Sequence, residues 1–190
     1  MEDPHTNLHL CHTDETDAPI RQELLASLEQ PVLIVSTTVG RGNVSVAETI
    51  QEAFPPDALV YHIPIEDVLP PAAVHEDLTR YRLISNRAPW LLRMIYTVPV
   101  FYYRKLWRER ALASTDLNRL EETMKSLGIR TVIAVSHRPA FWVSLLKMRG
   151  RHEAALWGVL TEFGRSLGWR YICWDAMDGY FSPVDRHNLD

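Results

Sequence analysis

Gly40, Gly42 and Asn43 stand where a backbone and a polar side chain can approach a ligand. The segment Gly40-Arg41-Gly42-Asn43 lies between a short apolar run and a helical pattern of apolar residues. Glycines in such a turn let the backbone come close to a ligand, and the amides at a helix start favour an anion or a polarised oxygen. The third glycine of a dinucleotide-binding turn is missing, and so is the Gly-Lys-Ser/Thr ending of a phosphate-binding loop. A tight turn in an ordinary α/β domain would use the same residues.

Two further polar candidates each follow a predicted strand. His137 comes after the apolar run 131–135, and Glu162 comes after residues 155–160. Ligands of open α/β sheets bind beyond the carboxyl ends of the strands, so both residues are candidates by position. A carboxylate there can act as a base or orient one. A structural histidine and a solvated loop carboxylate are the alternative interpretations.

Residues 87–110 combine six Arg or Lys residues and one acid with many aromatic side chains. Aromatic and apolar stretches flanked by cations suit the interface of an anionic membrane. A helix pair with aromatic residues in the core is the alternative, and single-stranded nucleic acid is a weaker one because the whole chain has a net charge of -4. The predicted membrane-binding residues are Trp90, Arg93, Tyr102, Tyr103, Arg104, Lys105, Trp107 and Arg108.

The first thirty residues are acidic, with seven Asp or Glu and one Arg. His5, His9, Cys11 and His12 fall in this stretch, and His and thiolate are good metal ligands. A partly disordered, solvated leader over residues 1–30 is the interpretation that we adopt, so we predict no metal and no cofactor. The start lacks the basic and apolar parts of a secretory signal.

The elements that position these residues alternate between strand and helix patterns. Residues 32–36, 59–63, 131–135 and 155–160 are short apolar runs, which are typical of strands buried on both faces. A helical period follows the glycine turn, a second one spans residues 117–127 and ends at Gly128, and a third spans 140–148. A last strand is expected near 171–174 or 179–182. The pattern predicts one α/β domain over residues 31–190 with a mainly parallel sheet.

Composition agrees with a single globular domain. The chain has 190 residues, of which 46% are hydrophobic and 23% are charged. This length suits one core, and the two cysteines exclude a disulfide framework or a four-cysteine zinc site. No stretch reaches the roughly 20 apolar residues of a membrane-spanning helix. We therefore expect a cytoplasmic protein without a nucleic-acid partner.

Two segments resemble one enzyme family. Residues 32–50, with the glycine turn, are similar to the opening of the monogalactosyldiacylglycerol synthase and processive diacylglycerol glucosyltransferase family. Residues 158–164 and 174–182 are similar to that family's Val-x-Thr-Asp-Phe stretch and to its later Trp-x-x-x-x-Val-Asp-x-Tyr-Phe-Val stretch. The resemblance implies a Rossmann-like three-layer domain, the N-terminal half of a GT-B glycosyltransferase, which binds the lipid acceptor and docks on the membrane.

The resemblance also implies roles for single residues. Asn43 stands where the family has its turn histidine, a candidate general base, and asparagine cannot accept a proton near neutral pH. Glu162 stands where the family has Asp, and Glu162 or His137 is expected to replace the missing base. Gly40, Arg41 and Gly42 are expected to bind the acceptor.

The resemblance implies that this chain is the acceptor-binding half of a glycolipid-forming glycosyltransferase. Such a half takes a sugar from a nucleotide sugar that a separate donor-binding domain or subunit holds, and its acceptor is a lipid such as diacylglycerol. Its expected location is peripheral, on the inner face of an anionic membrane. A non-catalytic lipid- or membrane-binding module and a stand-alone nucleotide-binding protein are the two alternatives.

Overall fold

The structure, a computed structural model, describes Leu25, Val74 and residues 27–38, 41–71, 116–161 and 176–181. Its strands alternate with helices along the chain, as the apolar runs and helical periods predict. The elements are β1 (Val32–Ser36), α2 (Arg41–Glu52), β2 (Val60–Pro64), α3 (Ile65–Val68), α7 (Asn118–Ser126), β3 (Thr131–Val135), α8 (His137–Met148), β4 (Ala155–Val159) and β5 (Gly179–Phe181).

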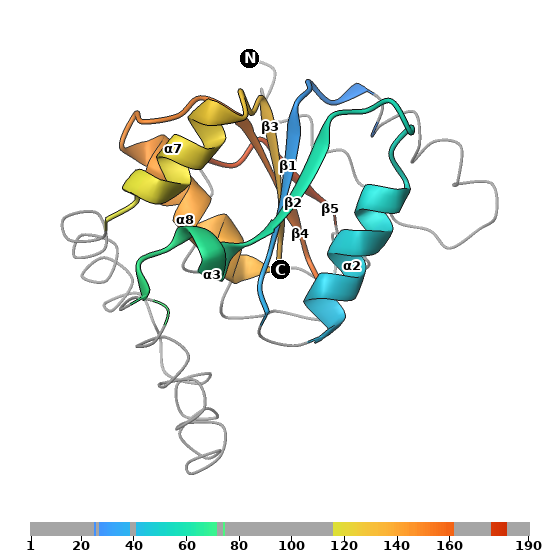
Figure 1. The fold of residues 1–190 in the computed structure, drawn as a ribbon, viewed down its shortest axis with the longest axis horizontal. Coiled ribbons are helices and arrows are strands. Elements are labelled where there is room, and N and C mark those ends of the chain that lie inside the picture. The colour runs from blue at the N-terminus through green and yellow to red at the C-terminus, as the bar shows by residue number, and fades with distance from the viewer. Residues whose placement is uncertain are drawn as a thin grey trace, which may run out of the picture.

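The strands form one parallel sheet in the order β2-β1-β3-β4-β5 (Figure 1). Val32 of β1 lies between Val60 of β2 and Thr131 of β3, and Thr131 lies beside Ala155 of β4. Parallel sheets are covered on both faces, so their central strands carry continuous apolar runs. Every residue of β1 and β3 is buried, which accounts for their sequence pattern.

Helices cover both faces of this sheet (Figure 1). Helix α2 lies on one face, and α3, α7 and α8 lie on the other. The chain moves from β1 to β2 in one direction across the sheet and from β2 to β3 and β4 in the opposite direction. Because crossovers between parallel strands are right-handed, two crossovers that run in opposite directions across the sheet place their helices on opposite faces. The prediction of a Rossmann-like, three-layer α/β domain with a parallel sheet is confirmed.

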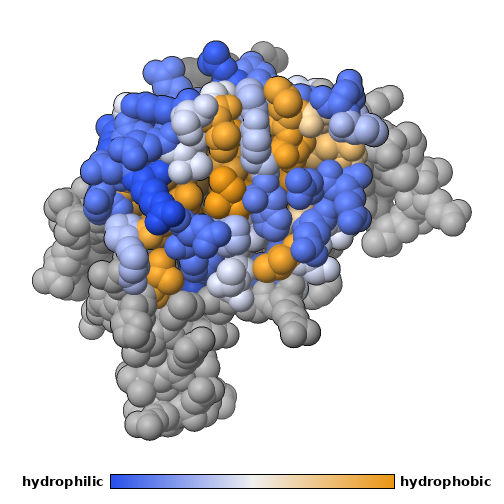
Figure 2. Space-filling model, viewed as in Figure 1, coloured by the Kyte–Doolittle hydropathy of each residue, from blue (hydrophilic) through white to orange (hydrophobic). Residues whose placement is uncertain are grey.

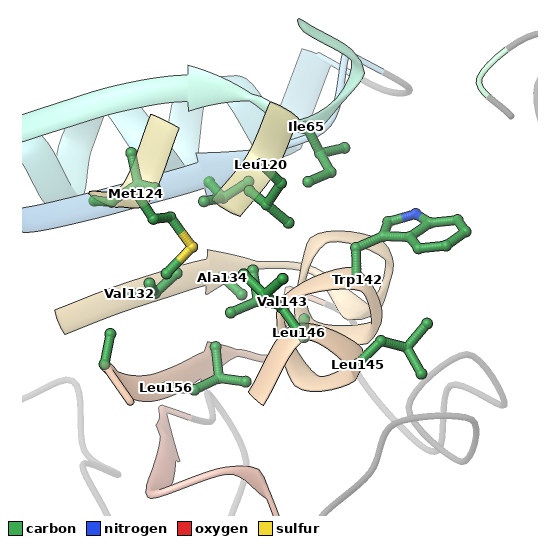
Figure 3. Packing of buried hydrophobic residues seen from close by; sticks show 14 of the residues in the cluster. Ile65, Leu120, Met124, Val132, Ala134, Trp142, Val143, Leu145, Leu146 and Leu156 are labelled. Carbon is green, nitrogen blue, oxygen red and sulfur yellow. The ribbon is translucent and has the colours of Figure 1, made fainter. Parts of the chain in front are cut away.

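The larger core cluster lies between the sheet and the helices α7 and α8 (Figure 3). Leu120 and Met124 of α7 and Leu146 of α8 pack in one cluster with Val132 of β3 and Leu156 of β4, and all five are fully buried. Burial of such a side chain contributes about 1.5–3 kcal/mol. A second cluster joins α2 to the opposite face of the sheet.

Strand β2 is one edge of the sheet among the described strands. The amide of Val32 donates to the carbonyl of Leu59 at 2.9 Å, which turns residues 59, 61 and 63 of the backbone toward β1. Residues 60, 62 and 64 then turn their backbone groups outward. Pro64, which has no N–H, occupies one of these outward positions, as proline does in edge strands. Figure 2 shows the molecule from the same side as Figure 1. On this face, apolar surface lies between hydrophilic patches.

Several predicted bounds differ from the structure. The sequence predicts a turn at residues 40–43 before the helix, whereas α2 already begins at Arg41, so Gly42 and Asn43 lie in its first turn. Gly42 and Asn43 have low helix propensity, so the sequence pattern predicts a later helix start. The packing of the apolar face of α2 compensates for this unfavourable propensity. Helix α8 begins at His137 rather than Ala140, and β5 matches the expected strand near 179–182. Gly128, with a φ of 63°, ends the helical stretch of α7 as predicted.

No helix within the described part of the chain is long and apolar enough to cross a membrane. The predicted membrane-binding segment, residues 87–110, lies outside the described residues, and so does most of the acidic leader. The predictions for both segments remain predictions.

Candidate functional site

The carboxyl ends of the parallel strands form one edge of the sheet, called here the carboxyl edge. The strand order makes β1 and β3 neighbours whose following helices, α2 and α8, lie on opposite faces. In open α/β sheets, ligands bind outside the carboxyl ends of strands at such a topological switch point. The candidate site is therefore the carboxyl edge around the ends of β1 and β3.

A carboxylate is fixed at the end of β1. Glu66, in the first turn of α3, accepts a hydrogen bond from the Thr37 hydroxyl at 2.5 Å and another from the Thr38 amide at 3.1 Å. The two bonds engage different carboxylate oxygens. Hydrogen bonds to a charged acceptor contribute about 1.5–3 kcal/mol. They hold a half-buried carboxylate at the switch point, and each oxygen keeps a lone pair for a ligand.

Ser36 and His62 form a second polar pair, and Ser36 directly precedes Thr37 in the sequence. The Ser36 hydroxyl lies 2.9 Å from Nε2 of His62, across the β1–β2 pair. Ser36 is completely buried, whereas His62 is half-buried on the edge strand. The pair satisfies a buried hydroxyl, which would otherwise cost free energy. Its burial gives Ser36 a structural role.

Asn43 meets a residue 118 positions away. The Thr161 hydroxyl donates a hydrogen bond to Oδ1 of Asn43 at 3.1 Å. Asn43 lies in the first turn of α2, and Thr161 follows the end of β4. Since β3 lies between β1 and β4 in the sheet, this bond links the segments that follow the two strands flanking β3. Asn43 therefore lies at the carboxyl edge, and its predicted role stays a prediction.

Ser136 lies at that end of β3 and has an unusual backbone. Its φ is 92° and its ψ is 165°, a combination that glycine adopts readily and other residues rarely do. Its amide donates to the carbonyl of Val159 at 3.2 Å, which holds the residue against β4. Such a backbone costs about 1–3 kcal/mol and persists only where the surroundings impose it. Nothing in the sequence marks it, because serine carries no signal for positive φ.

The structure places the predicted site residues in three groups. Asn43 and His137 lie at the carboxyl edge, in the first turns of α2 and α8. Gly42 is exposed in the first turn of α2, and a Cβ added to it would have no heavy atom within 4 Å. The residues that lie outside the described part of the chain are Gly40, the Arg41 side chain, Glu162 and all eight predicted membrane-binding residues.

Glu66 and Ser136 are the candidates that the sequence analysis missed. Glu66 follows β2 directly, and the same position rule that selected His137 and Glu162 would have selected it. Its pairing with Thr37 and Thr38 depends on β1 and β2 being neighbours. No group of three or more potential metal ligands occurs within the described residues. The described groups at this edge include hydroxyls, the Asn43 amide, the His137 imidazole and the Glu66 carboxylate.

Comparisons with family models, with curated proteins and with solved structures found no match to this chain. The residues at the carboxyl edge and the sequence resemblance are therefore what indicates a function.

Proposed function

We propose that this chain is the acceptor-binding, membrane-docking half of a glycolipid-forming glycosyltransferase. It binds a lipid hydroxyl acceptor, such as diacylglycerol, at the carboxyl edge. A donor-binding domain or subunit supplies the nucleotide sugar. The acceptor hydroxyl attacks the anomeric carbon, the bond to the nucleoside diphosphate breaks, and a base takes the hydroxyl proton.

One observation carries this proposal. The two segments that resemble the glycosyltransferase family, around Asn43 and around Thr161, are joined by a hydrogen bond at the topological switch point. Segments that build one acceptor site must meet in space although they are far apart in the chain. Glu66 adds a carboxylate at the same edge, and a carboxylate can accept the proton that Asn43 cannot.

Membrane docking is tested by co-sedimentation with vesicles. Replacement of Arg104, Lys105 and Arg108 by Ala is expected to weaken binding to anionic vesicles, most strongly at low salt, because screening shortens the reach of surface charge. The matched control replaces three exposed cations elsewhere, Arg119, Lys125 and Arg130, and removes the same charge. Equal binding by both triple variants and the original chain contradicts membrane docking through residues 87–110.

Acceptor binding is tested separately in the same vesicles. Diacylglycerol added to the bilayer is expected to raise binding of the original chain, and Asn43→Ala is expected to reduce this increment while anion-dependent docking persists. A chain that responds to anionic lipid but not to diacylglycerol is the non-catalytic membrane module. A chain that binds no vesicle is neither a membrane-docking glycosyltransferase half nor a membrane-binding module.

The position of Glu66 favours one second candidate, a nucleotide-binding protein. In dinucleotide-binding domains an acidic residue beyond the glycine turn hydrogen-bonds a ribose hydroxyl, and Glu66 follows β2 after such a turn and helix. A nucleotide should then raise the melting temperature of the chain. Glu66→Gln should abolish that rise. No response to a panel of nucleotides excludes this candidate.

A further inference from the structure

A row of side chains on β4 leads from Thr161 away from the carboxyl edge. Leu156 and Leu160 pack in the cluster beneath α7 and α8, so the residues that alternate with them point to the opposite face, which carries α2. On that face, Trp157 and Val159 pack against the α2 cluster, yet each keeps part of its side chain exposed. We call Trp157, Val159 and Thr161 the β4 row, which is polar at one end and apolar along the rest.

Helix α2 presents a second row of the same kind. Asn43, Val46 and Ile50 are spaced by three and four residues, so they lie on one side of the helix. Because Asn43 accepts a hydrogen bond from Thr161, this side faces the β4 row. Val46 and Ile50 are half-buried and pack against the same cluster as the apolar residues of β4.

The two rows run in the same direction. Helix α2 returns from the carboxyl edge toward the amino ends of the strands, because the parallel strand β2 that follows it starts there. The helix rises about 10 Å from Asn43 to Ile50, and the strand spans about 13 Å from Thr161 to Trp157. The rows therefore also agree in length. The apolar strip is defined as Val46 and Ile50 of α2 with Trp157 and Val159 of β4.

An aromatic side chain of β5 borders this strip. The ring centroid of Phe181 lies 5.6 Å from that of Trp157, whose ring lies against Gly179. Phe181 is half-buried too. Helix α2 packs chiefly on β1, β2 and β3, so the strip lies at its margin, where apolar side chains are partly in water. A ligand that covers them gains free energy in proportion to the apolar area buried.

The polarity of the strip selects a class of ligand. Its end at the carboxyl edge holds an amide and a hydroxyl, and the side chains along it are aliphatic and aromatic. Ligand sites are mostly apolar and use a few polar groups to fix orientation. An acyl chain with an oxygen-bearing head has the same order of polarity. A peptide backbone or a phosphate would leave polar groups unpaired beside these side chains.

We propose that the apolar strip binds a fatty acyl chain whose head points to the carboxyl edge. The assignment of this chain to the lipid acceptor rests on the proposed function, because the acceptor hydroxyl then lies beside Asn43 and Thr161. The strip thus holds the tail of the same molecule whose head binds at the carboxyl edge. Each methylene that the strip buries raises the affinity by about fourfold at most.

The test titrates the full chain with monoacylglycerols of hexanoyl, octanoyl and decanoyl length, at concentrations below micelle formation, and with glycerol alone. Binding is followed by isothermal calorimetry and by the melting temperature. The affinity is expected to rise with chain length, and glycerol is expected to give no measurable binding. No binding of any monoacylglycerol, or an affinity that does not depend on chain length, overturns the proposal.

Val159→Thr locates the bound chain. It keeps a β-branched side chain and replaces one methyl of the strip by a hydroxyl, so decanoyl binding should weaken about fourfold, the contribution of one methylene. Val60→Thr is the matched control, because Val60 is a half-buried strand valine that packs against the same cluster but lies on β2, outside the strip. Its affinity should equal that of the original chain. An equal loss in both variants overturns the proposal.

Val46→Thr keeps the test decisive if the Val159 variant fails to fold. It makes the same change on the α2 side of the strip and should weaken decanoyl binding by a similar factor. Unchanged affinity in every folded strip variant overturns the proposal.

Failure of the strip and failure of the proposed function give different results. If diacylglycerol raises vesicle binding equally in the original chain and in Val159→Thr, the proposed function stands and the strip is wrong. If methyl decanoate binds as tightly as decanoyl glycerol, Asn43→Ala changes neither, and Val159→Thr weakens both, the strip stands and the acceptor function is wrong. The first result overturns the proposal, and the second supports an acyl-chain site without a hydroxyl site.

Discussion

His152 is a single residue whose protonation is linked to folding. It lies in the loop between α8 and β4, and its Nδ1 accepts a hydrogen bond from the amide of Ala154 at 3.0 Å. Burial of the ring is the main cause that lowers the pKa of His152 below its ordinary value of 6.5, and the charge of Lys125 acts in the same direction. A protonated ring could not accept the bond from Ala154.

This shift predicts how stability depends on pH. The unfolded chain takes up a proton on His152 near pH 6.5, whereas the folded chain takes it up only at lower pH. Stability from His152 is therefore present above pH 6.5 and is lost as the pH falls through the folded pKa. His152→Asn keeps an acceptor for the Ala154 amide but carries no group that titrates in this range. Between pH 8 and about 5, the unfolding free energy of this variant should therefore fall less than that of the original chain, as measured by urea unfolding. Parallel curves for the two chains would contradict the linkage.

At the scale of one element, Gly179 lets β5 pack against β4. A Cβ at this position would overlap the six-membered ring of Trp157, which also lies 5.6 Å from the Phe181 ring between centroids. Gly179→Ala should therefore destabilise the fold by about 1–3 kcal/mol through overpacking. The measurement is the midpoint of urea unfolding.

Gly42→Ala is the matched control for Gly179. Gly42 lies in helix α2 beside open space, so alanine meets no atom and improves helix propensity. Its midpoint should rise or stay unchanged. If both alanine variants lower the midpoint equally, the cause is backbone conformation rather than the contact with Trp157.

At the scale of the whole molecule, both faces of one sheet should unfold together. Leu120 belongs to the cluster of α7 and α8, and Phe54 belongs to the cluster of α2 on the opposite face. Leu120→Ala should cost about 2–5 kcal/mol and Phe54→Ala about 3–5 kcal/mol. Each should shift one transition seen equally by circular dichroism and tryptophan fluorescence.

Leu59→Ala controls for loss of an apolar side chain in general. Leu59 is 55% exposed, so the substitution should change stability by no more than about 0.5 kcal/mol. If one core variant splits the two probes into separate transitions, the two faces do not form one cooperative unit.

The sheet could be predicted because its signal lies in consecutive residues. The two central strands are buried on both faces, which leaves the continuous apolar runs 32–36 and 131–135 in the sequence. The sequence pattern predicts a later start for α2 than the observed Arg41, because Gly42 and Asn43 have turn propensities that tertiary packing overrides.

The candidate site could be predicted only in part. Position after a strand selected His137, and the glycine turn selected Asn43. The partners of Asn43 and Glu66 depend on strand neighbours distant in sequence, which a local pattern does not encode. The backbone of Ser136 results from contacts made by its neighbours, so the residue type gives no indication of it.

Pro64 at the outward side of β2 has a consequence for the protein at high concentration. An exposed strand edge is a template on which a second chain can add a strand, and repeated addition leads to aggregation. Proline interrupts the row of amide donors that an incoming strand needs, close to the carboxyl edge. The same residue that ends β2 therefore limits edge-to-edge association through this strand.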